Sequence, residues 1–388
     1  MIATATAEFR KRFNREPLIV SSPGRINLIG EHTDYNEGFV LPAAIDKRIV
    51  YAIALNGTDT CNAHALFNGE TQSFSLENIE PGGDWINYFI GVVYHLQQQG
   101  YGVKGFDCVI TGDIPIGAGM SSSAAVEGGL AVGLDHLLNF NLSRMEMARI
   151  GQLAEHTFPG VKCGIMDQFA NLHGRKDSVM LLDCRSLDYQ YFPFRFSDEV
   201  KVVLVNSMVH HSLASSEYNV RRAQCEEGVK ILRDVYPGIN SLRDLTSEQI
   251  IQQKHILPAK VYDRCLYVTQ ENERVEKACA HLQRNELKEA GALMFASHEG
   301  LSKLYEVSCP ELDFLAQLAA QRPEVAGARM MGGGFGGCTI NLVQTDKVGE
   351  FRDFVQEQFR QRYGVSPEIY ITSIEDGAKV QLTTETVA

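Results

Sequence analysis

Three polar side chains capable of chemistry follow directly after a segment that is typical of a buried strand. The stretch GRINLIGEHTDYNEGFVLP, residues 24–42, begins with apolar residues and then places Glu31, His32 and Asp34 within four residues. A turn at Asn36-Glu37-Gly38 precedes a return to apolar residues. A simple polar turn explains the Asn-Glu-Gly, but it does not explain three charged or titratable groups beside the strand.

A second candidate site is the glycine- and serine-rich loop PIGAGMSSSAA, residues 115–125. Gly117 and Gly119 allow positive φ and close approach of the backbone. We expect a helix to begin at once, so that its free N–H groups and its dipole create an anion site. The alternative is a serine-capped helix after a flexible turn. The loop lacks the Lys-Ser/Thr of a P-loop and the third glycine of a dinucleotide fingerprint, so a nucleotide bound here belongs to another class.

Two acidic residues further along could serve phosphoryl transfer. Glu155 lies near the end of a helix that a capping-box pattern opens at Ser143, and it shares a face with Gly151. It could hold Mg²⁺ or could be a solvated surface acid. Asp167 lies in CGIMDQFANLHG; if this segment is helical, Asp167 shares one face with Gly164, with room for a ligand above the glycine. The alternative is again a surface acid. The core face of that helix would carry Ile165, Phe169 and Leu172.

The glycine loop GGGFGG, residues 332–337, lies between two predicted strands. So many glycines cost backbone entropy. The loop is either a flexible hairpin or a backbone that must approach another loop or a ligand closely.

The pattern of elements predicts an α+β chain. Strands are predicted at PLIVSS, RINLIG, GFDCVITGDI, VMLLDC and KVVLVNS, and a long helical region is predicted over about 215–320. The last part predicts strand, glycine loop, strand, helix, strand, with Gly364 as the helix C-cap. At 388 residues two domains are expected, and we place them at 1–190 and 191–388.

Composition excludes several classes of function. The net charge of −12 argues against binding to nucleic acid or to an anionic membrane. No apolar run approaches the ~20 residues of a membrane span, and the N-terminus lacks a signal-peptide pattern. The nine cysteines show no zinc-ligand spacing, so a reducing cytoplasm is expected. No heptad pattern suggests an oligomer, and we expect a monomer.

Taken together, these segments resemble the galactokinases, a branch of the GHMP family of sugar and small-molecule kinases. The segment GRINLIGEHTDYN matches the galactokinase signature almost in full, and residues 115–124 resemble the GHMP phosphate loop. Similar matches to family segments are CGIMDQ at 163–168, SEYNVRR at 216–222 and the glycine loop at 332–337. The resemblance spans nearly the whole chain. It implies a two-domain GHMP kinase fold, with a mixed-sheet N-terminal domain, an α/β-layered C-terminal domain and the active site between them.

The resemblance also implies an activity: transfer of a phosphoryl group from ATP to the C1 hydroxyl of galactose, the first step of the Leloir route. Asp167 would accept or orient the hydroxyl proton, and Arg25 would favour the ionised carboxylate and stabilise the transferred group. Carboxylates accept hydrogen bonds from neighbouring hydroxyls, so the acids of the first motif can read a sugar. The implied galactose contacts are Glu31, His32, Thr33, Asp34, Gly164, Asp167 and Tyr218. The implied phosphate cradle is Gly117, Ala118, Gly119, Met120, Ser121, Ser122 and Ser123, with Mg²⁺ on Ser123 and Glu155.

Two other functions stay open at this point. One is a kinase for a related sugar, such as N-acetylgalactosamine, arabinose or galacturonate. The other is a non-catalytic sugar and ATP sensor, against which the intact Ser121–Ala124 segment, Arg25 and Asp167 argue. Met120 and Met331 depart from the family pattern, in which Leu and Thr are usual. The first swap conserves volume, and the second removes a hydroxyl near the nucleotide.

Overall fold

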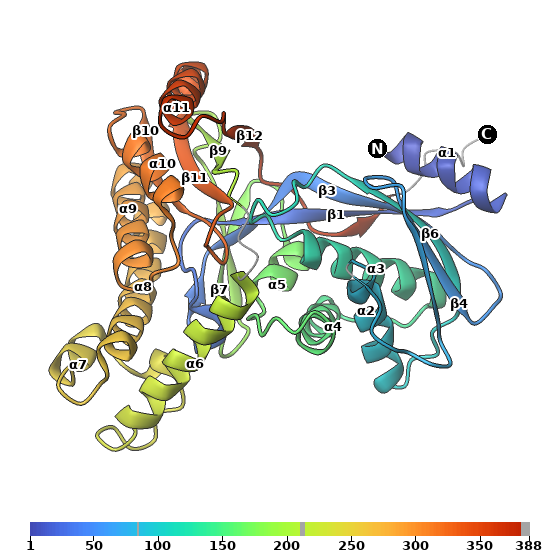
Figure 1. Cartoon of the computed structure of the whole chain (residues 1–388), viewed down its shortest axis with the longest axis horizontal. Helices are drawn as coiled ribbons and strands as arrows, with labels where there is room; N and C mark the ends of the chain where they lie inside the picture. Colours follow the sequence, from blue (N-terminus) through green and yellow to red (C-terminus); the bar gives the residue numbers. More distant parts are fainter. Residues whose placement is uncertain (84, 210–213, 382–388) are drawn as a thin grey trace.

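The computed structural model describes residues 1–83, 85–209 and 214–381. Two layered halves lie side by side, each made of a β-sheet with helices packed on it (Figure 1). The predicted α+β class is confirmed. The predicted boundary between residues 190 and 191 stays a prediction.

The first half is built on a mixed six-stranded sheet with the strand order β13-β1-β3-β6-β4-β5. Only the β4–β6 pair among its described strands is parallel. The last strand, β13, returns from the end of the chain to pair with β1. The strands are β1 (Leu18–Asn27), β3 (Pro42–Leu55), β4 (Thr60–Ala65), β5 (Thr71–Ser75), β6 (Phe106–Gly112) and β13 (Lys379–Val380).

Both faces of this sheet are covered. Val20, Tyr51 and Ile53 belong to the large core, while the alternating Ile19 and Val50 pack with helix α1 on the opposite face. This explains why the segments 18–20 of β1 and 49–55 of β3 are apolar at every position rather than at alternate ones. Helix α1 (Ile2–Phe13) lies above the sheet in Figure 1, and four helices lie below it: α2 (Ile86–Gln98), α3 (Ser122–Leu138), α4 (Arg144–Thr157) and α5 (Met166–His173).

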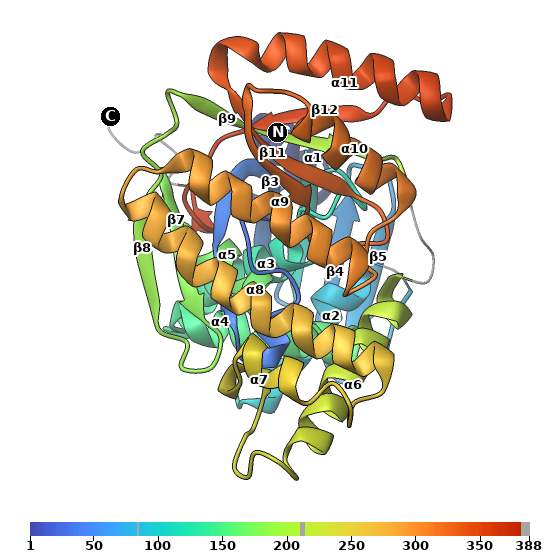
Figure 2. The same cartoon turned by 90° about the vertical axis from the view of Figure 1, so that its left-hand side faces the viewer.

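The second half carries an antiparallel sheet with the order β10-β11-β9-β12. Helices α8 and α9 pack against each other (Figure 2). Helices α9 and α10 pack on β10. The strands are β9 (Val200–Asn206), β10 (Val325–Met330), β11 (Cys338–Gln344) and β12 (Glu368–Thr372). The helices are α6 (Ala214–Leu232), α7 (Ser247–Gln252), α8 (Ala259–Gln283), α9 (Leu287–Lys303), α10 (Pro310–Ala320) and α11 (Val348–Tyr363), with short 3₁₀ turns η2 (Leu242–Asp244) and η3 (Thr345–Lys347).

A small antiparallel sheet follows the first motif. It has the strand order β2-β7-β8. Its first strand, β2, comes directly after the 3₁₀ turn η1 (Asp34–Asn36), which carries Asp34 of the motif. Its strands are β2 (Phe39–Val40), β7 (Ser178–Asp183) and β8 (Tyr189–Pro193).

The prediction of two separate strands at PLIVSS and RINLIG is wrong. They form one strand, β1, whose pairing with β3 shifts register between Pro23 and Arg25. Pro23-Gly24 therefore marks a bulge rather than an end. A Cβ at Gly24 would lie 2.7 Å from the carbonyl oxygen of Met120, so the glycine lets the phosphate loop dock on β1.

Several local predictions are confirmed. Ser143 and Glu146 form the capping box of α4, and Gly364 ends α11 with φ 74°. Gly117 and Gly119 have φ of 74° and 75°. None of the helices formed by the described residues is both long and apolar enough to cross a bilayer.

Candidate active site

A cavity of about 210 Å³ lies where the two halves of the molecule meet. This is smaller than the ~300–1,000 Å³ of sites for drug-sized ligands, which suits a compact substrate. Seven of the predicted site residues line it: Arg25, Glu31, His32, Asp34, Glu155, Asp167 and Tyr218. The residues Val161, Cys163, Met166 and Gly332–Gly334 complete its wall.

Arg25 and Asp167 form a two-pronged ion pair at the cavity wall. Nε of Arg25 donates to Oδ1 of Asp167 at 2.7 Å, and Nη2 donates to Oδ2 at 2.8 Å. The Arg25 side chain is 5% exposed and that of Asp167 is 25% exposed, so the carboxylate is the partner that faces the cavity. Burial alone would lower the pKa of Arg25, but the negative charges of Asp167, Glu31 and Asp34 raise it. The guanidinium is therefore charged, and the Asp167 surface alternative is wrong.

The phosphate loop contacts this pair directly. Nη1 of Arg25 donates to the carbonyl of Gly119, and the hydroxyl of Ser121 donates to Oδ2 of Asp167. Ser121 precedes α3 with a left-handed backbone, φ 55°. Its side chain therefore orients the aspartate, a contact that the sequence prediction did not include. Ser122 and Ser123 begin α3, which places its N-terminus beside the cavity.

Glu155 is buried, so the surface alternative for this residue is wrong. Oε2 of Glu155 accepts from the thiol of Cys163 at 2.9 Å and from Nε2 of Gln168 at 3.2 Å. Burial raises its pKa, although hydrogen bonds from Cys163 and Ser123 act in the opposite direction. Ser123 thus lies near Glu155, so that their two oxygens could share one cation.

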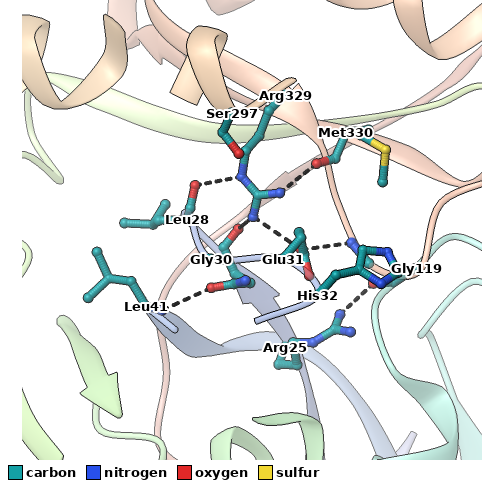
Figure 3. Close-up of polar contacts among 12 residues, drawn as sticks. Arg25, Leu28, Gly30, Glu31, His32, Leu41, Gly119, Ser297, Arg329 and Met330 are labelled. Atoms are coloured by element: carbon teal, nitrogen blue, oxygen red, sulfur yellow. Dashed lines mark hydrogen bonds and ion pairs between the residues drawn. The ribbon is translucent and has the colours of Figure 1, made fainter. Parts of the chain in front are cut away.

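Glu31 joins the two halves of the molecule (Figure 3). Its Oε1 accepts from the backbone N–H of Gly332 at 2.8 Å and from Nη2 of Arg329 at 3.1 Å. Arg329, on β10, is fully buried and also donates to the carbonyls of Leu28, Asn27 and Met330. A buried guanidinium is stable here because each branch has a carbonyl or carboxylate acceptor. Arg329 was not predicted from the sequence; the signal is a lone arginine inside an otherwise apolar strand.

His32 has a left-handed backbone, φ 61°, and its ring lies in an aromatic cluster. The ring centroid is 5.2 Å from that of Tyr218 and 4.9 Å from that of Tyr305. Its Nδ1 lies 2.8 Å from the Tyr35 hydroxyl, and its Nε2 lies 3.2 Å from the carbonyl of Gly333. Burial lowers its pKa to about 3, so the ring is neutral.

Asp34 reaches the cavity from η1 and packs against Gly164. A Cβ at Gly164 would lie 2.0 Å from Oδ2 of Asp34, so only glycine fits there. Burial, together with the charge of Asp167, raises the pKa of Asp34 to about 7. Gly164 precedes α5 rather than sharing a helical face with Asp167, because the helix begins at Met166.

Two predicted sugar contacts do not line this cavity. Gly164 lies behind Asp34, and the Thr33 hydroxyl donates to the carbonyls of Gly30 and Phe39. Thr33 therefore closes the motif's own turn.

The two glycine loops pack against each other. A Cβ at Gly119 would lie 3.0 Å from the carbonyl oxygen of Met331, and one at Gly337 would lie 3.3 Å from that of Gly117. Gly334 and Gly336, with φ of 84° and 142°, approach Val307 and Val209 similarly. The close-approach interpretation of residues 332–337 is therefore confirmed, and the flexible hairpin is not.

Comparison with known proteins matches three segments of the chain to family profiles. A galactokinase galactose-binding signature matches residues 7–55, a GHMP kinases N-terminal domain matches 87–175, and a GHMP kinases C-terminal domain matches 277–361.

Whole-chain relatives agree with these matches. A galactokinase of Roseiflexus sp. (strain RS-1) is 39% identical over 96% of both chains, and one of Clostridium perfringens is 41% identical over 96% of this chain and 98% of its own. The crystal structure of Lactococcus lactis galactokinase complexed with galactose has a TM-score of 0.93 at 35% identity, covering 97% of this chain and 99% of that one. A mevalonate kinase structure, 20% identical with a TM-score of 0.64, shares the fold. The chain belongs to the galactokinase family of GHMP kinases.

Proposed function

We propose that this protein transfers the γ-phosphoryl group of ATP to the C1 hydroxyl of α-D-galactose, giving galactose 1-phosphate and ADP. The observation that carries the proposal is the Arg25–Asp167 pair, which opens onto a small cavity walled by Glu31, His32 and Asp34. The galactose complex of the Lactococcus lactis relative supports the choice of sugar.

Transfer is in line and direct. The C1 oxygen forms a bond to the γ-phosphorus as the bond to the bridging oxygen of ADP breaks, and no phosphoenzyme forms. Asp167 orients the hydroxyl and receives its proton; Ser121 and Arg25 hold the carboxylate toward the cavity. Because the transition state is loose, most of the catalysis comes from positioning and from charge stabilisation by Arg25.

The phosphate loop, residues 115–124, receives the nucleotide. Backbone N–H groups of Gly117–Ser123 and the N-terminus of α3 supply donors and a positive dipole for the phosphates. Galactose contacts are assigned to Glu31, His32, Asp34, Asp167 and Tyr218, which line the cavity, with Thr33 and Gly164 supporting that wall.

The residues around Glu155 fit a magnesium ion. Among the described residues no group of three or more acids, histidines or cysteines is arranged as a metal site. Mg²⁺ in kinases is typically held by one or two protein ligands plus phosphates and water. Ser123 and Glu155 would hold it, since each has a side-chain oxygen and the Ser123 hydroxyl acts on the pKa of Glu155. The bound ion would neutralise charge on the ATP phosphates.

We further propose a cytoplasmic monomer. All nine cysteines are free thiols, as a reducing compartment requires.

Coupled ADP release from purified protein with ATP and Mg²⁺, with and without galactose, tests the proposal. We expect galactose-dependent turnover that Asp167→Asn lowers by roughly 10²-fold to 10⁴-fold. Calorimetry should show that this variant still binds galactose. Asp353→Asn, at an exposed position, is the matched control. Binding of galactose without turnover would indicate a sensor, and faster turnover of N-acetylgalactosamine would indicate a different sugar.

A further inference from the structure

Two consecutive residues of the first motif, Glu31 and His32, contact the backbone of two consecutive residues of the glycine loop, Gly332 and Gly333. Glu31 accepts from the N–H of Gly332, and the ring of His32 meets the carbonyl of Gly333. The segment that they hold lies on the phosphate loop, because a Cβ at Gly332 would lie 3.2 Å from the carbonyl oxygen of Gly119. The wall of the sugar pocket is thus joined to the phosphate loop through one layer of backbone.

A chain of hydrogen bonds runs from His32 into the second half of the molecule. The Tyr35 hydroxyl lies 2.8 Å from Nδ1 of His32 and 2.8 Å from the Tyr305 hydroxyl. The Tyr305 hydroxyl lies 3.2 Å from the thiol of Cys225. This relay, Cys225–Tyr305–Tyr35–His32–Gly333, links α6 to the glycine loop.

One carbonyl sets the direction of every bond in the relay. The Gly333 oxygen can only accept, so Nε2 of His32 must carry the proton of a neutral ring. Nδ1 is then an acceptor, and Tyr35 must donate to it. The Tyr35 oxygen in turn accepts from Tyr305, and the Tyr305 oxygen accepts from the thiol of Cys225.

The reversed relay is unfavourable. With the proton on Nδ1, an unprotonated Nε2 would face the Gly333 carbonyl at 3.2 Å, and two acceptors would repel each other. Water cannot easily relieve this conflict, because His32 is 3% exposed and Tyr305 and Cys225 are buried. The low pKa of His32, about 3, excludes a doubly protonated ring as an escape.

We propose that Tyr35 and Tyr305 are positioning residues, which hold the Nε2–H ring of His32 in contact with Gly333 so that the ring couples the galactose pocket to the glycine loop and the phosphate loop. Galactose and ATP would then bind cooperatively. The identity of these two ligands rests on the proposed function. Neither tyrosine lines the cavity described above, so each acts through His32.

The coupling is measured as a ratio: the galactose dissociation constant without nucleotide divided by the constant with nucleotide. Calorimetry gives this constant without nucleotide and with a saturating non-hydrolysable ATP analogue and Mg²⁺. In Tyr35→Phe the donor to Nδ1 is lost, and we expect the ratio to fall about fivefold or more. Tyr305→Phe should cause a smaller loss, since Tyr35 still donates to the ring. Cys225→Ala should leave the ratio unchanged, because the Gly333 carbonyl still sets the direction.

Tyr51→Phe is the matched control. The Tyr51 hydroxyl is buried and donates to the carbonyl of Val126, outside the relay. A loss of stability without loss of coupling is expected for this variant. If Tyr51→Phe lowers the ratio as much as Tyr35→Phe does, the effect is a general one and the proposal is overturned.

The tautomer of His32 is an independent readout, measured by ¹⁵N NMR on protein without ligands. We expect Nε2–H in the wild type and also in Tyr35→Phe, since the Gly333 carbonyl is still present, but a shifted Nδ1 resonance in Tyr35→Phe, because the donor to Nδ1 is lost. An Nδ1–H ring in the wild type, or an unchanged coupling ratio in Tyr35→Phe, would overturn the inference. Failure of the wild type to bind galactose would instead refute the proposed function, and the NMR result would still decide the positioning role.

Discussion

A methyl group at position 164 should weaken galactose binding without touching the nucleotide site. Gly164 does not have a left-handed φ, so alanine strains nothing in the backbone itself. Its Cβ would lie 2.0 Å from Oδ2 and 2.1 Å from Cγ of Asp34, whereas real Cβ contacts almost never fall below 3.0 Å. In Gly164→Ala the Asp34 carboxylate must therefore move by about 1 Å or more.

The size of the effect follows from the contacts that this carboxylate would lose. The Asp34 carboxylate accepts from the N–H of Tyr35 at 3.0 Å, and the backbone N–H of Met166 also favours its ionised form. A hydrogen bond to a charged group is worth roughly 1.5–3 kcal/mol, and the same range applies to its bond with a sugar hydroxyl. Loss of that bond raises the dissociation constant of galactose by roughly 10-fold to 150-fold.

Titration calorimetry with galactose and, separately, with Mg²⁺ and an ATP analogue checks this prediction. Gly102→Ala is the matched control, because its Cβ would meet nothing within 4 Å. We expect nucleotide affinity within about twofold of the wild type in both variants. Galactose affinity within twofold in a folded Gly164→Ala protein would show that the Asp34 carboxylate is not a galactose contact.

Three further predictions concern charge at the site. Burial and the charge of Asp167 raise the pKa of Asp34 to about 7. The ionised carboxylate, which accepts hydrogen bonds from the sugar, therefore forms as the pH rises through that value. Galactose affinity should therefore rise by up to ~tenfold per pH unit below about pH 7 and then level off; calorimetry across that pH range checks it, and a flat wild-type profile contradicts it. Arg329→Met leaves Glu31 buried without its cation, and urea unfolding should show a loss of ~3–5 kcal/mol, less when Glu31→Gln is added. Glu155→Gln should raise the Mg²⁺ concentration for half-maximal turnover roughly tenfold or more at a nearly unchanged galactose KM, and equal Mg²⁺ dependence would remove Glu155 as a ligand.

Features with a local cause were predictable from the sequence. The capping box of α4 and the left-handed Gly364 depend on residues a few positions apart, and both are present. The first motif pointed to a polar site because its three titratable groups follow an apolar strand. The bulge in β1 was missed, since Pro23-Gly24 reads as a break when the partner strand and the Met120 carbonyl are not known.

Contacts between residues that are far apart in the sequence could not be predicted. Ser121 precedes α3 whereas Asp167 lies on α5, and Glu31 meets Arg329 across the two halves of the molecule. No periodicity or spacing encodes these contacts. The burial of Glu155 could not be predicted for the same reason. A glutamate on a helix is usually exposed, and its burial here depends on the thiol of Cys163 and the amide of Gln168, which hydrogen-bond to it.

The structure also changes how substitutions in the first motif must be interpreted. Oε1 of Glu31 and both ring nitrogens of His32 already have protein partners, and two of those partners are peptides of the glycine loop. Removal of either side chain therefore disturbs the loop that packs on the phosphate loop, as well as any contact with the sugar. A raised KM in Glu31→Ala or His32→Ala would mix these two effects. Among the described residues, the hydrogen bond of the Asp34 carboxylate comes from the N–H of Tyr35 in its own turn, so its displacement by a methyl group at position 164 is the cleaner measure of sugar recognition.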